Sequence, residues 1–168
     1  MILSRSTISS LLREADPERR LVITPLLDEA EQVGKASVDV RLGNEFVIVN
    51  KQTGILGIDP LRRTNLAQRL MKYQRQMKIP FGSPFYLHPQ DFCLATTLEY
   101  LAFPQTLAAY VIGRSSWGRL GLIIATATMI EPGFKGTLVL ELANVGSVPI
   151  VLYPMVRIAQ LVLHSVGK

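Results

Sequence analysis

The fold is decided by Gly113 to Leu142, which reads GRSSWGRLGLIIATATMIEPGFKGTLVLEL. Two apolar runs in this stretch, GLIIATAT and TLVLEL, are bounded by glycine and proline and are typical of β-strands. The same stretch carries cations, hydroxyls and carboxylates among its apolar residues: Arg114, Ser115, Ser116, Arg119, Glu131 and Glu141. Charged groups are costly to bury unless they are paired or used. We therefore treat these residues as candidates for a functional site.

Outside this stretch, short runs rich in Val, Ile, Leu, Phe and Tyr alternate with turn residues from Leu21 onward. The further runs are LVIT, SVDVRL, EFVIV, PFYL, FCLATTLEYL, LAAYVI, PIVLY and RIAQLVL. Many short strands of this kind predict an all-β sandwich or barrel. A short helix is expected before them, because Ser4 can cap a run whose apolar positions have helical spacing: Ile8, Leu11, Leu12 and Ala15. With no internal repeat or linker in the sequence, residues 1–168 are expected to form one domain.

A basic segment interrupts the pattern of strands. Leu61 to Lys78 holds six Lys or Arg residues and no acid. Thr64 can cap a helix here, and four apolar side chains fall on one helical face: Leu66, Leu70, Tyr73 and Met77. The spacing predicts an amphipathic helix inserted over about residues 65–77, with a basic face that is either solvated or binds an anion or a partner. Nucleic acid is disfavoured, because Tyr73 is the only aromatic residue among these charges.

Composition narrows the range of partners and compartments. The formal net charge is +5 and the sequence pI is about 9.6, which suits nucleic acid, a membrane surface or a small polyanion such as a triphosphate. The apolar run Leu120 to Ile130 is too short to span a bilayer, and the N-terminus MILSRSTISS lacks the pattern of a signal peptide. A single cysteine, Cys93, excludes an internal disulfide framework. We expect a cytoplasmic protein.

Several familiar sites are excluded by their missing residues. GRSSWGRL has the glycine spacing of a P-loop, but Arg119 and Leu120 stand where that motif needs Lys and Ser/Thr. The chain has no Gly-x-Ser-x-Gly elbow for a serine hydrolase, and one cysteine cannot supply the zinc site of nucleobase deaminases. Any chemistry is therefore expected to be metal-free at the reacting atom, or to use magnesium through the phosphates of a substrate.

Two features remain as candidates for binding or structure. The turn from Gly113 to Gly118 offers backbone N–H groups, two hydroxyls and Arg114, which are the donors that a di- or triphosphate needs. On TLVLEL the leucines share one face, and Glu141 shares the other with Val139, so the pattern alone favours a solvent-facing Glu141. In SVDVRLG, Asp39 and Arg41 share a face and are expected to form a structural ion pair with each other.

Taken in order, GRSSWGRLGL, IEPGFKG and LVLEL resemble the dCTP deaminase branch of the dUTPase-like family. The resemblance extends to MILS, SVDVRLG, FYLHPQDFCLATTLEYLAFP and PIVLYPMVRIAQL, and so covers nearly the whole chain apart from the basic segment. It implies a mainly β fold, a distorted β-barrel or jelly-roll-like domain, with a short N-terminal helix and one inserted helix. It also implies a homotrimer with active sites at the subunit interfaces.

The activity implied by the resemblance is the deamination of dCTP at C4 to dUTP and ammonia. Glu141 matches the catalytic glutamate, which would serve as general base and then general acid on the attacking water. Ser115 would orient the water or the base, and Arg119 would stabilise the glutamate and the transition state from a neighbouring subunit. No zinc is implied, and Mg2+ would accompany the triphosphate.

The resemblance also implies a set of substrate-binding residues. Phosphates would be held by Arg114, Ser115, Ser116, Arg119 and the backbone from Trp117 to Gly118. Glu131 stands in the place of an aspartate near the deoxyribose 3′-hydroxyl, and Phe134 would pack against the sugar. Val139 and Leu140 would read the base through backbone groups.

This sequence departs from the family pattern at several points. It has ATATM where bacterial deaminases have His-x-Thr-Ala, and Met155 where glycine is common, so the turn at Met155 is expected to differ. Family members are also expected to continue beyond QLVL with a segment that covers the triphosphate. Two alternatives stay open: dUTP hydrolysis to dUMP, alone or together with deamination, and a non-catalytic trimeric relative that only binds nucleotides.

Overall fold

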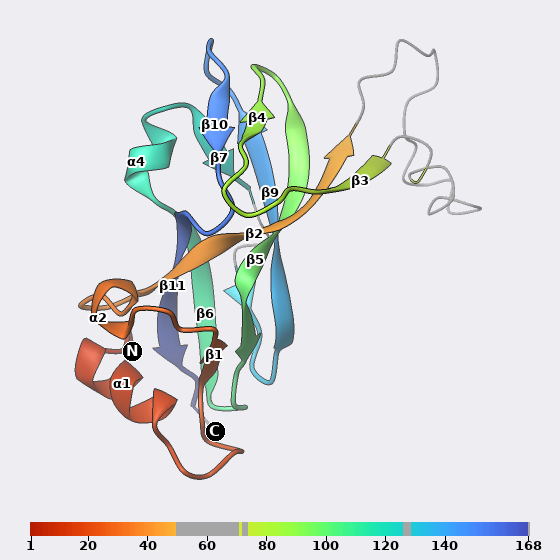
Figure 1. Ribbon diagram of the computed structural model, residues 1–168. Coiled ribbons are helices and arrows are strands. Elements are labelled where there is room, and N and C mark those ends of the chain that lie inside the picture. The colour runs from red at the N-terminus through yellow and green to blue at the C-terminus, as the bar shows by residue number, and fades with distance from the viewer. Residues whose placement is uncertain (50–70, 72–73, 126–128, 168) are drawn as a thin grey trace, which may run out of the picture.

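The computed structural model is built mainly from β-strands, as the sequence predicts (Figure 1). The structure describes residues 1–49, 71, 74–125 and 129–167. The strands in this part of the chain are β1 (Val22–Thr24), β2 (Val38–Val49), β3 (Gln74–Lys78), β4 (Phe85–Leu87), β5 (Phe92–Ala102), β6 (Leu107–Gly113), β7 (Leu122–Ile124), β8 (Met129–Ile130), β9 (Lys135–Asn144), β10 (Ile150–Leu152) and β11 (Arg157–Ser165). Its helices are α1 (Arg5–Leu12), α2 (Glu29–Gln32) and α4 (Ser115–Gly118).

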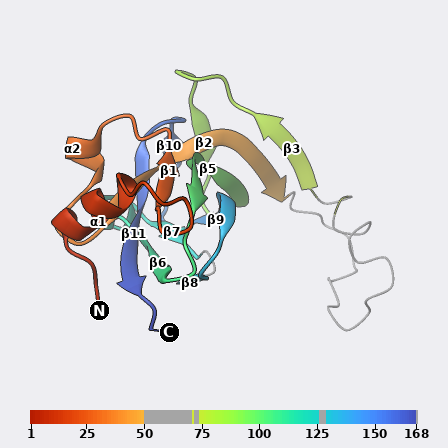
Figure 2. The same ribbon diagram turned by 90° about the horizontal axis from the view of Figure 1, so that it is seen from below.

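Nine of these strands form one antiparallel sheet, and seven of them follow the order β7-β9-β5-β2-β11-β6-β8. The other two are β1, which pairs with β5, and β3, which pairs with β2, while β4 and β10 form a separate pair. Figure 2 shows the strands in a curve around the core rather than in a flat layer. The arrangement confirms the predicted barrel-like β fold, and β7 follows α4 directly in the chain.

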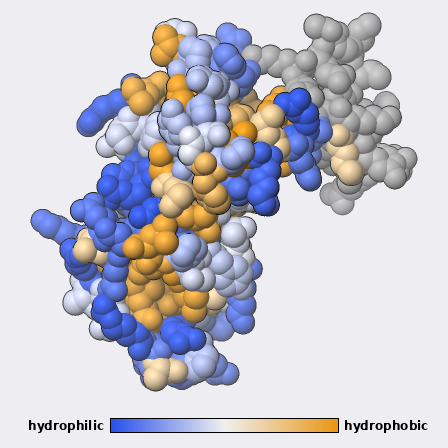
Figure 3. Space-filling model, in the orientation of Figure 1, coloured by the Kyte–Doolittle hydropathy of each residue, from blue (hydrophilic) through white to orange (hydrophobic). Residues whose placement is uncertain are grey.

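The core lies inside this curve, because one face of each long strand is apolar. On β9 the leucines Leu138, Leu140 and Leu142 are buried, as the alternation predicts. The largest side chains that are fully buried are Ile8, Leu21, Leu42, Phe46, Leu87, Leu101, Leu140, Leu142, Leu152, Ile158, Leu161 and Leu163. On the face shown in Figure 3, further hydrophobic residues gather over the central strands, with hydrophilic residues around them. Among the described residues, no helix combines the length and the apolar character that crossing a membrane requires.

The N-terminal helix begins where the sequence predicts. Ser4 caps α1, its Oγ accepting a hydrogen bond from the backbone N–H of Thr7 at 3.4 Å. Ile8 is completely buried, so it attaches the helix to the core. The helix ends at Leu12, however, and Ala15 lies exposed beyond it. The short helix α2, capped by Asp28, has too few apolar positions to be found from spacing.

The predicted basic helix is wrong at its C-terminal end. Residues 65–70 and 72–73 lie outside the described residues, but Gln74 to Lys78 form strand β3. This strand pairs with β2, so that Lys78 lies opposite Glu45, with 3.6 Å between Lys78 Nζ and Glu45 Oε1. Met77 packs against the core from β3. Hydrogen bonding to β2 thus outweighs the helical spacing of the apolar residues here.

Cys93 lies within the core on β5 and is 1% exposed. Burial, and to a smaller extent the nearby charge of Asp91, raises the pKa of the Cys93 thiol to about 12. The side chain is therefore a small apolar group of the core rather than a reactive thiolate.

Two turns depend on left-handed backbone. Gly121 has a φ of 92°, and a Cβ placed on it would lie 2.7 Å from the backbone nitrogen of Gly146. Met155 also has left-handed backbone, with a φ of 78°. The turn was expected to differ because methionine stands where glycine is common, yet its backbone has the conformation that glycine favours. The backbone N–H of Met155 donates to the carbonyl of Leu42 at 2.7 Å, which holds the turn against β2.

Replacing Met155 with glycine should raise the stability of the protein. A side chain in the left-handed region costs about 1–2 kcal/mol, and part of the relief is offset because glycine gains freedom in the unfolded chain. We expect Met155→Gly to raise the free energy of unfolding by about 0.5–1 kcal/mol, measured in urea at a fixed protein concentration. Met155→Ala is the control, because it removes the same side chain but keeps the Cβ. Equal stability of the two variants would show that the backbone at Met155 is unstrained.

Candidate active site

The turn predicted over Gly113 to Gly118 is found as the one-turn helix α4 directly after β6. The carbonyl of Arg114 accepts the backbone N–H groups of Trp117 at 3.0 Å and Gly118 at 3.1 Å. The indole Nε1 of Trp117 donates to the carbonyl of Arg157 on β11 at 2.9 Å. Ser115 and Ser116 remain exposed. The turn is therefore fixed to the sheet by its tryptophan, while its hydroxyls face outward.

Beside α4 lies a cavity with a volume of about 590 Å³, which we call the arginine cavity. It is lined by Arg41, Arg114, Ser116, Trp117, Leu120, Met155, Val156 and Arg157. Burial, and then the positive charge of Arg157, lowers the pKa of Arg114 below its ordinary value. Three guanidinium groups and a hydroxyl at one opening favour an anionic ligand.

Asp39 on β2 connects this cavity to the sheet. Its Oδ2 forms an ion pair with Nη1 of Arg114 and lies 3.5 Å from Nη1 of Arg157, and its Oδ1 accepts a hydrogen bond from Gln160 Nε2 at 3.0 Å. The predicted pair of Asp39 with Arg41 is therefore wrong: Arg41 pairs with Glu99 instead, at 3.6 Å. Residues two apart on a strand are about 7 Å apart along the chain, and arginines from neighbouring elements come closer to Asp39.

Glu99 on β5 is a completely buried carboxylate that the sequence reasoning missed. It accepts hydrogen bonds from Gln32 Nε2 at 3.0 Å and from the backbone N–H of Arg41 at 2.8 Å. Burial raises the pKa of Glu99, and these hydrogen bonds together with the Arg41 charge oppose that rise. The alternation in FCLATTLEYL places this acid on the same face as Cys93 and Ala95, which was the available signal.

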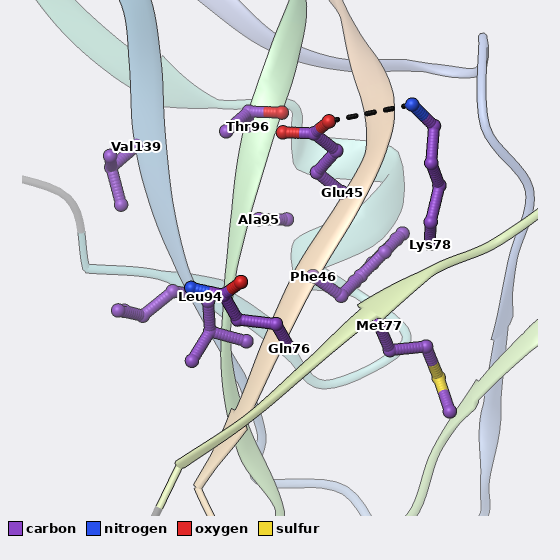
Figure 4. Close-up of a pocket in the computed structure, with 10 residues that line it drawn as sticks. Glu45, Phe46, Gln76, Met77, Lys78, Leu94, Ala95, Thr96 and Val139 are labelled. Atoms are coloured by element: carbon purple, nitrogen blue, oxygen red, sulfur yellow. Dashed lines mark ion pairs between the residues drawn. The ribbon is translucent and has the colours of Figure 1, made fainter. Parts of the chain in front are cut away.

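Glu141 stands on the outward face of β9, as the alternation predicts. It is partly buried and lies opposite Leu94 of β5, while its backbone carbonyl accepts the N–H of Ala125 at 2.9 Å. A groove of about 460 Å³ lies on this side of the sheet, lined by residues of β2, β3 and β5 and by Val139 of β9. Figure 4 shows its lining: Glu45, Phe46, Val47, Gln76, Met77, Lys78, Leu94, Ala95, Thr96 and Val139. Glu141 is not among these residues, but its cross-strand neighbour Leu94 and Val139, two residues before it on the same face of β9, are.

The predicted site residues are divided among three places in one chain. Arg114, Ser116 and Trp117 line the arginine cavity, and Arg119 is exposed at the end of α4. Val139 lines the groove beside Glu141, whereas the side chain of Leu140 lies completely buried in the core.

The two remaining predicted residues lie in the turn between β8 and β9. Glu131 is exposed, and its carbonyl accepts the backbone N–H of Phe134 at 3.2 Å. Phe134 packs partly buried against the core. This turn is thus a third surface, in addition to the cavity and the groove.

The described residues also bear on the expected metal. Within them, no group of three or more His, Cys, Asp and Glu side chains is placed to hold a metal ion. The arginine cavity offers hydrogen-bond donors, which suit phosphate oxygens rather than a bare cation. Magnesium bound to a polyphosphate keeps oxygen ligands from the phosphates and from water.

Comparison with known proteins assigns the family. The model of the dCTP deaminase-like family matches residues 2–166. The "dCTP deaminase, dUMP-forming" of Methanobrevibacter smithii is 42% identical over 165 residues, covering 98% of this chain and 80% of its own length. The "dCTP deaminase" of Halorubrum lacusprofundi is 44% identical over 163 residues, covering 96% and 76%. The chain belongs to the dCTP deaminase-like family.

The fold agrees with a solved structure of the same kind. The crystal structure of 2′-deoxycytidine 5′-triphosphate deaminase from Agrobacterium tumefaciens superposes with a TM-score of 0.71 at 24% identity. The match covers 99% of this chain but 46% of that one, so this chain spans about half the length of that protein. At this identity the likeness concerns the fold.

Glu99→Gln should destabilise the protein most at acidic pH. The amide keeps one acceptor oxygen, but its NH2 group would face the donor of either Gln32 or Arg41, and we expect a loss of about 2 kcal/mol in the free energy of unfolding. Because the pKa of Glu99 is raised above its usual 4.5 in the folded state, the wild type loses stability as the pH rises through the folded pKa, whereas the variant cannot ionise.

The difference in free energy of unfolding between the wild type and Glu99→Gln, measured in urea, should therefore become smaller from about pH 4 toward neutral pH. Glu29→Gln, which removes a partly exposed carboxylate paired with Arg13, is the control and should change stability little. A constant difference across the range would contradict the raised pKa of Glu99.

Proposed function

We propose that this protein deaminates dCTP at C4 of cytosine, giving dUTP and ammonia, with Glu141 as general base and then general acid. Membership of the dCTP deaminase-like family gives the reaction class. The observation that carries the proposal is the position of Glu141: it lies on the outer face of β9 beside the groove, two residues after Val139. A planar base can enter a mainly apolar groove of this kind and bring C4 to the carboxylate.

The chemistry requires one proton acceptor that later becomes a donor. Water attacks C4, forming a C–O bond, while its proton moves to the carboxylate of Glu141. Glu141 passes this proton to N3 of the ring, then takes the second proton from the C4 hydroxyl and delivers it to the amine, so that the C4–N bond breaks, ammonia departs and a C4 carbonyl remains. One carboxylate can serve both steps because it is regenerated when the proton is passed on.

We infer that α4 of a second subunit completes this site, within a homotrimer. Ser115, which would orient the water, and Arg119, which would stabilise the glutamate and the transition state, are exposed on α4. Large apolar side chains are also exposed on the strands next to α4 and Glu141, as expected of a surface that another subunit covers. They are Tyr110, Ile112, Ile123, Met129 and Val139.

The triphosphate would lie against α4. Arg114, Ser115, Ser116, Arg119 and the backbone N–H groups of Trp117 and Gly118 supply charge and hydrogen-bond donors, and magnesium would arrive with the phosphates. Glu131 would accept a hydrogen bond from the 3′-hydroxyl of the deoxyribose, and Phe134 would pack against the sugar ring. Val139 and Leu140 would recognise the base through their backbone groups. A cytoplasmic location fits an activity on free nucleotides.

A second activity, cleavage of dUTP to dUMP and pyrophosphate, is favoured by one observation. Relatives from Methanobrevibacter smithii and Dictyoglomus turgidum, at 42% and 44% identity, are named as dUMP-forming. In this chain Glu131 is the carboxylate near the sugar that we would test for this step. Incubation of the protein with magnesium and either dCTP or dUTP, followed by chromatography of the nucleotides, separates the two activities. Formation of dUTP alone from dCTP would exclude the second activity.

Glu141→Gln should abolish the release of ammonia from dCTP. Losing a general base costs about 10²–10⁴ in rate, and here the same group also supplies the acid. Ammonia release is measured by a coupled assay, and the oligomeric state by light scattering, which should match that of the wild type. Glu29→Gln serves as the control and should retain activity within about twofold, since it lies on α2 away from the groove.

Undiminished activity of Glu141→Gln would remove this residue from the mechanism. Thermal stabilisation of the wild type by dCTP and by dUTP without turnover of either would instead identify a nucleotide-binding relative that is not an enzyme.

A further inference from the structure

Asp39 is the single carboxylate that contacts both Arg114 and Arg157 among the ion pairs of the described residues. It is 6% exposed and sits on β2, behind the wall of the arginine cavity. Oδ2 faces the two guanidinium groups, and Oδ1 is held by the amide of Gln160 on β11. Asp39 is therefore held between two paired strands, by its own backbone on β2 and by the amide of Gln160 on β11.

The two arginines reach this carboxylate from different elements. Arg114 caps the N-terminal end of α4, whereas Arg157 is the first residue of β11 and also pairs with Glu31 at 3.1 Å. Both line the arginine cavity. A guanidinium has five N–H donors, so each arginine can contact Asp39 and still present donors to a ligand.

Without a counterion, these two cations would separate. Like charges repel at short range, and the partly buried position of Arg114 strengthens the effect because less water screens it. Asp39 removes this repulsion and brings both guanidinium groups to the same opening. Arg41, the third cation that lines the cavity, pairs with Glu99 of β5 instead. The carboxylates thus hold the arginines in place from behind the cavity.

We propose that Asp39 is a positioning residue that holds Arg114 and Arg157 side by side as a pair of cations for a polyphosphate chain, with Arg157 as a phosphate-binding residue. The identity of the ligand as the tail of a nucleotide rests on the proposed function. The recognition itself requires only the chemistry of linked phosphates, whose oxygens accept hydrogen bonds from both guanidinium groups.

Binding of inorganic tripolyphosphate, measured by calorimetry at low ionic strength, tests this role independently of catalysis. Asp39→Asn should weaken binding by roughly tenfold, because the arginines lose their common anchor. Glu31→Gln is the matched control: it also removes one negative charge next to Arg157, yet it leaves Arg114 on Asp39, and Arg157 Nη1 keeps its bond to the carbonyl of Glu31 at 3.1 Å. We expect its affinity to stay within about twofold of the wild type or to rise.

A double-mutant cycle distinguishes positioning from a general structural effect. Arg114→Ala and Arg157→Ala should each weaken tripolyphosphate binding by roughly tenfold. If Asp39 acts through the arginines, adding Asp39→Asn to Arg114→Ala should weaken binding by much less than it does in the wild type. Full additivity would show that Asp39 does not act through Arg114 and would overturn the proposal.

The remaining outcomes are also decisive. Tighter binding by Asp39→Asn would make Asp39 a competing anion, and absence of tripolyphosphate binding by the wild type would also overturn the proposal. If Asp39→Asn does not fold, unchanged affinity in Arg157→Ala is enough to overturn it. The wild type could bind tripolyphosphate, and the variants could change its affinity as expected, while neither dCTP nor dUTP is converted. In that case the positioning role stands and the proposed function fails.

Discussion

The carboxylate of Asp39 links the start of α4 to two neighbouring strands of the sheet, β2 and β11. From β2 it contacts Gln160 and Arg157 on β11 and Arg114 at the start of α4. A buried ion pair contributes little net stability, because the cost of removing water from the charges offsets their attraction. Its value here is geometric. It sets where α4 begins, and the indole of Trp117 then fixes the rest of that turn to the backbone of β11.

Most of the strands could be predicted because their apolar residues alternate and their ends carry glycine, proline or asparagine. β9 is the clearest case, since its three inward leucines and the outward Glu141 followed directly from the period of two. β3 could not be predicted in the same way. Gln74 to Lys78 has one inward apolar residue, Met77. It becomes a strand because β2 offers it hydrogen bonds, and its partners on β2 lie 25 to 33 residues earlier in the sequence.

The candidate site was predictable as a set of residues but not as an arrangement. The polar residues of the GRSSWGRL turn were visible as polar groups in an apolar stretch, and the turn they form exists. Their partners were not visible. Asp39 was expected to pair with Arg41 on its own strand, whereas the curvature of the sheet brings Arg114 and Arg157 closer. Glu99 was missed altogether: the alternation of β5 places it on the buried face, but its partners, Gln32 and the backbone of Arg41, lie far away in the sequence.

The burial of Cys93 has a practical consequence for studying this protein in solution. A thiol whose pKa is about 12, enclosed in the core, stays protonated at neutral pH and out of reach of maleimides and other alkylating probes. Within the sequence it is also the only cysteine. A cysteine introduced on the surface of α4 or beside the groove would therefore be the single site that accepts a fluorophore or spin label, and the core of the chain would be left intact.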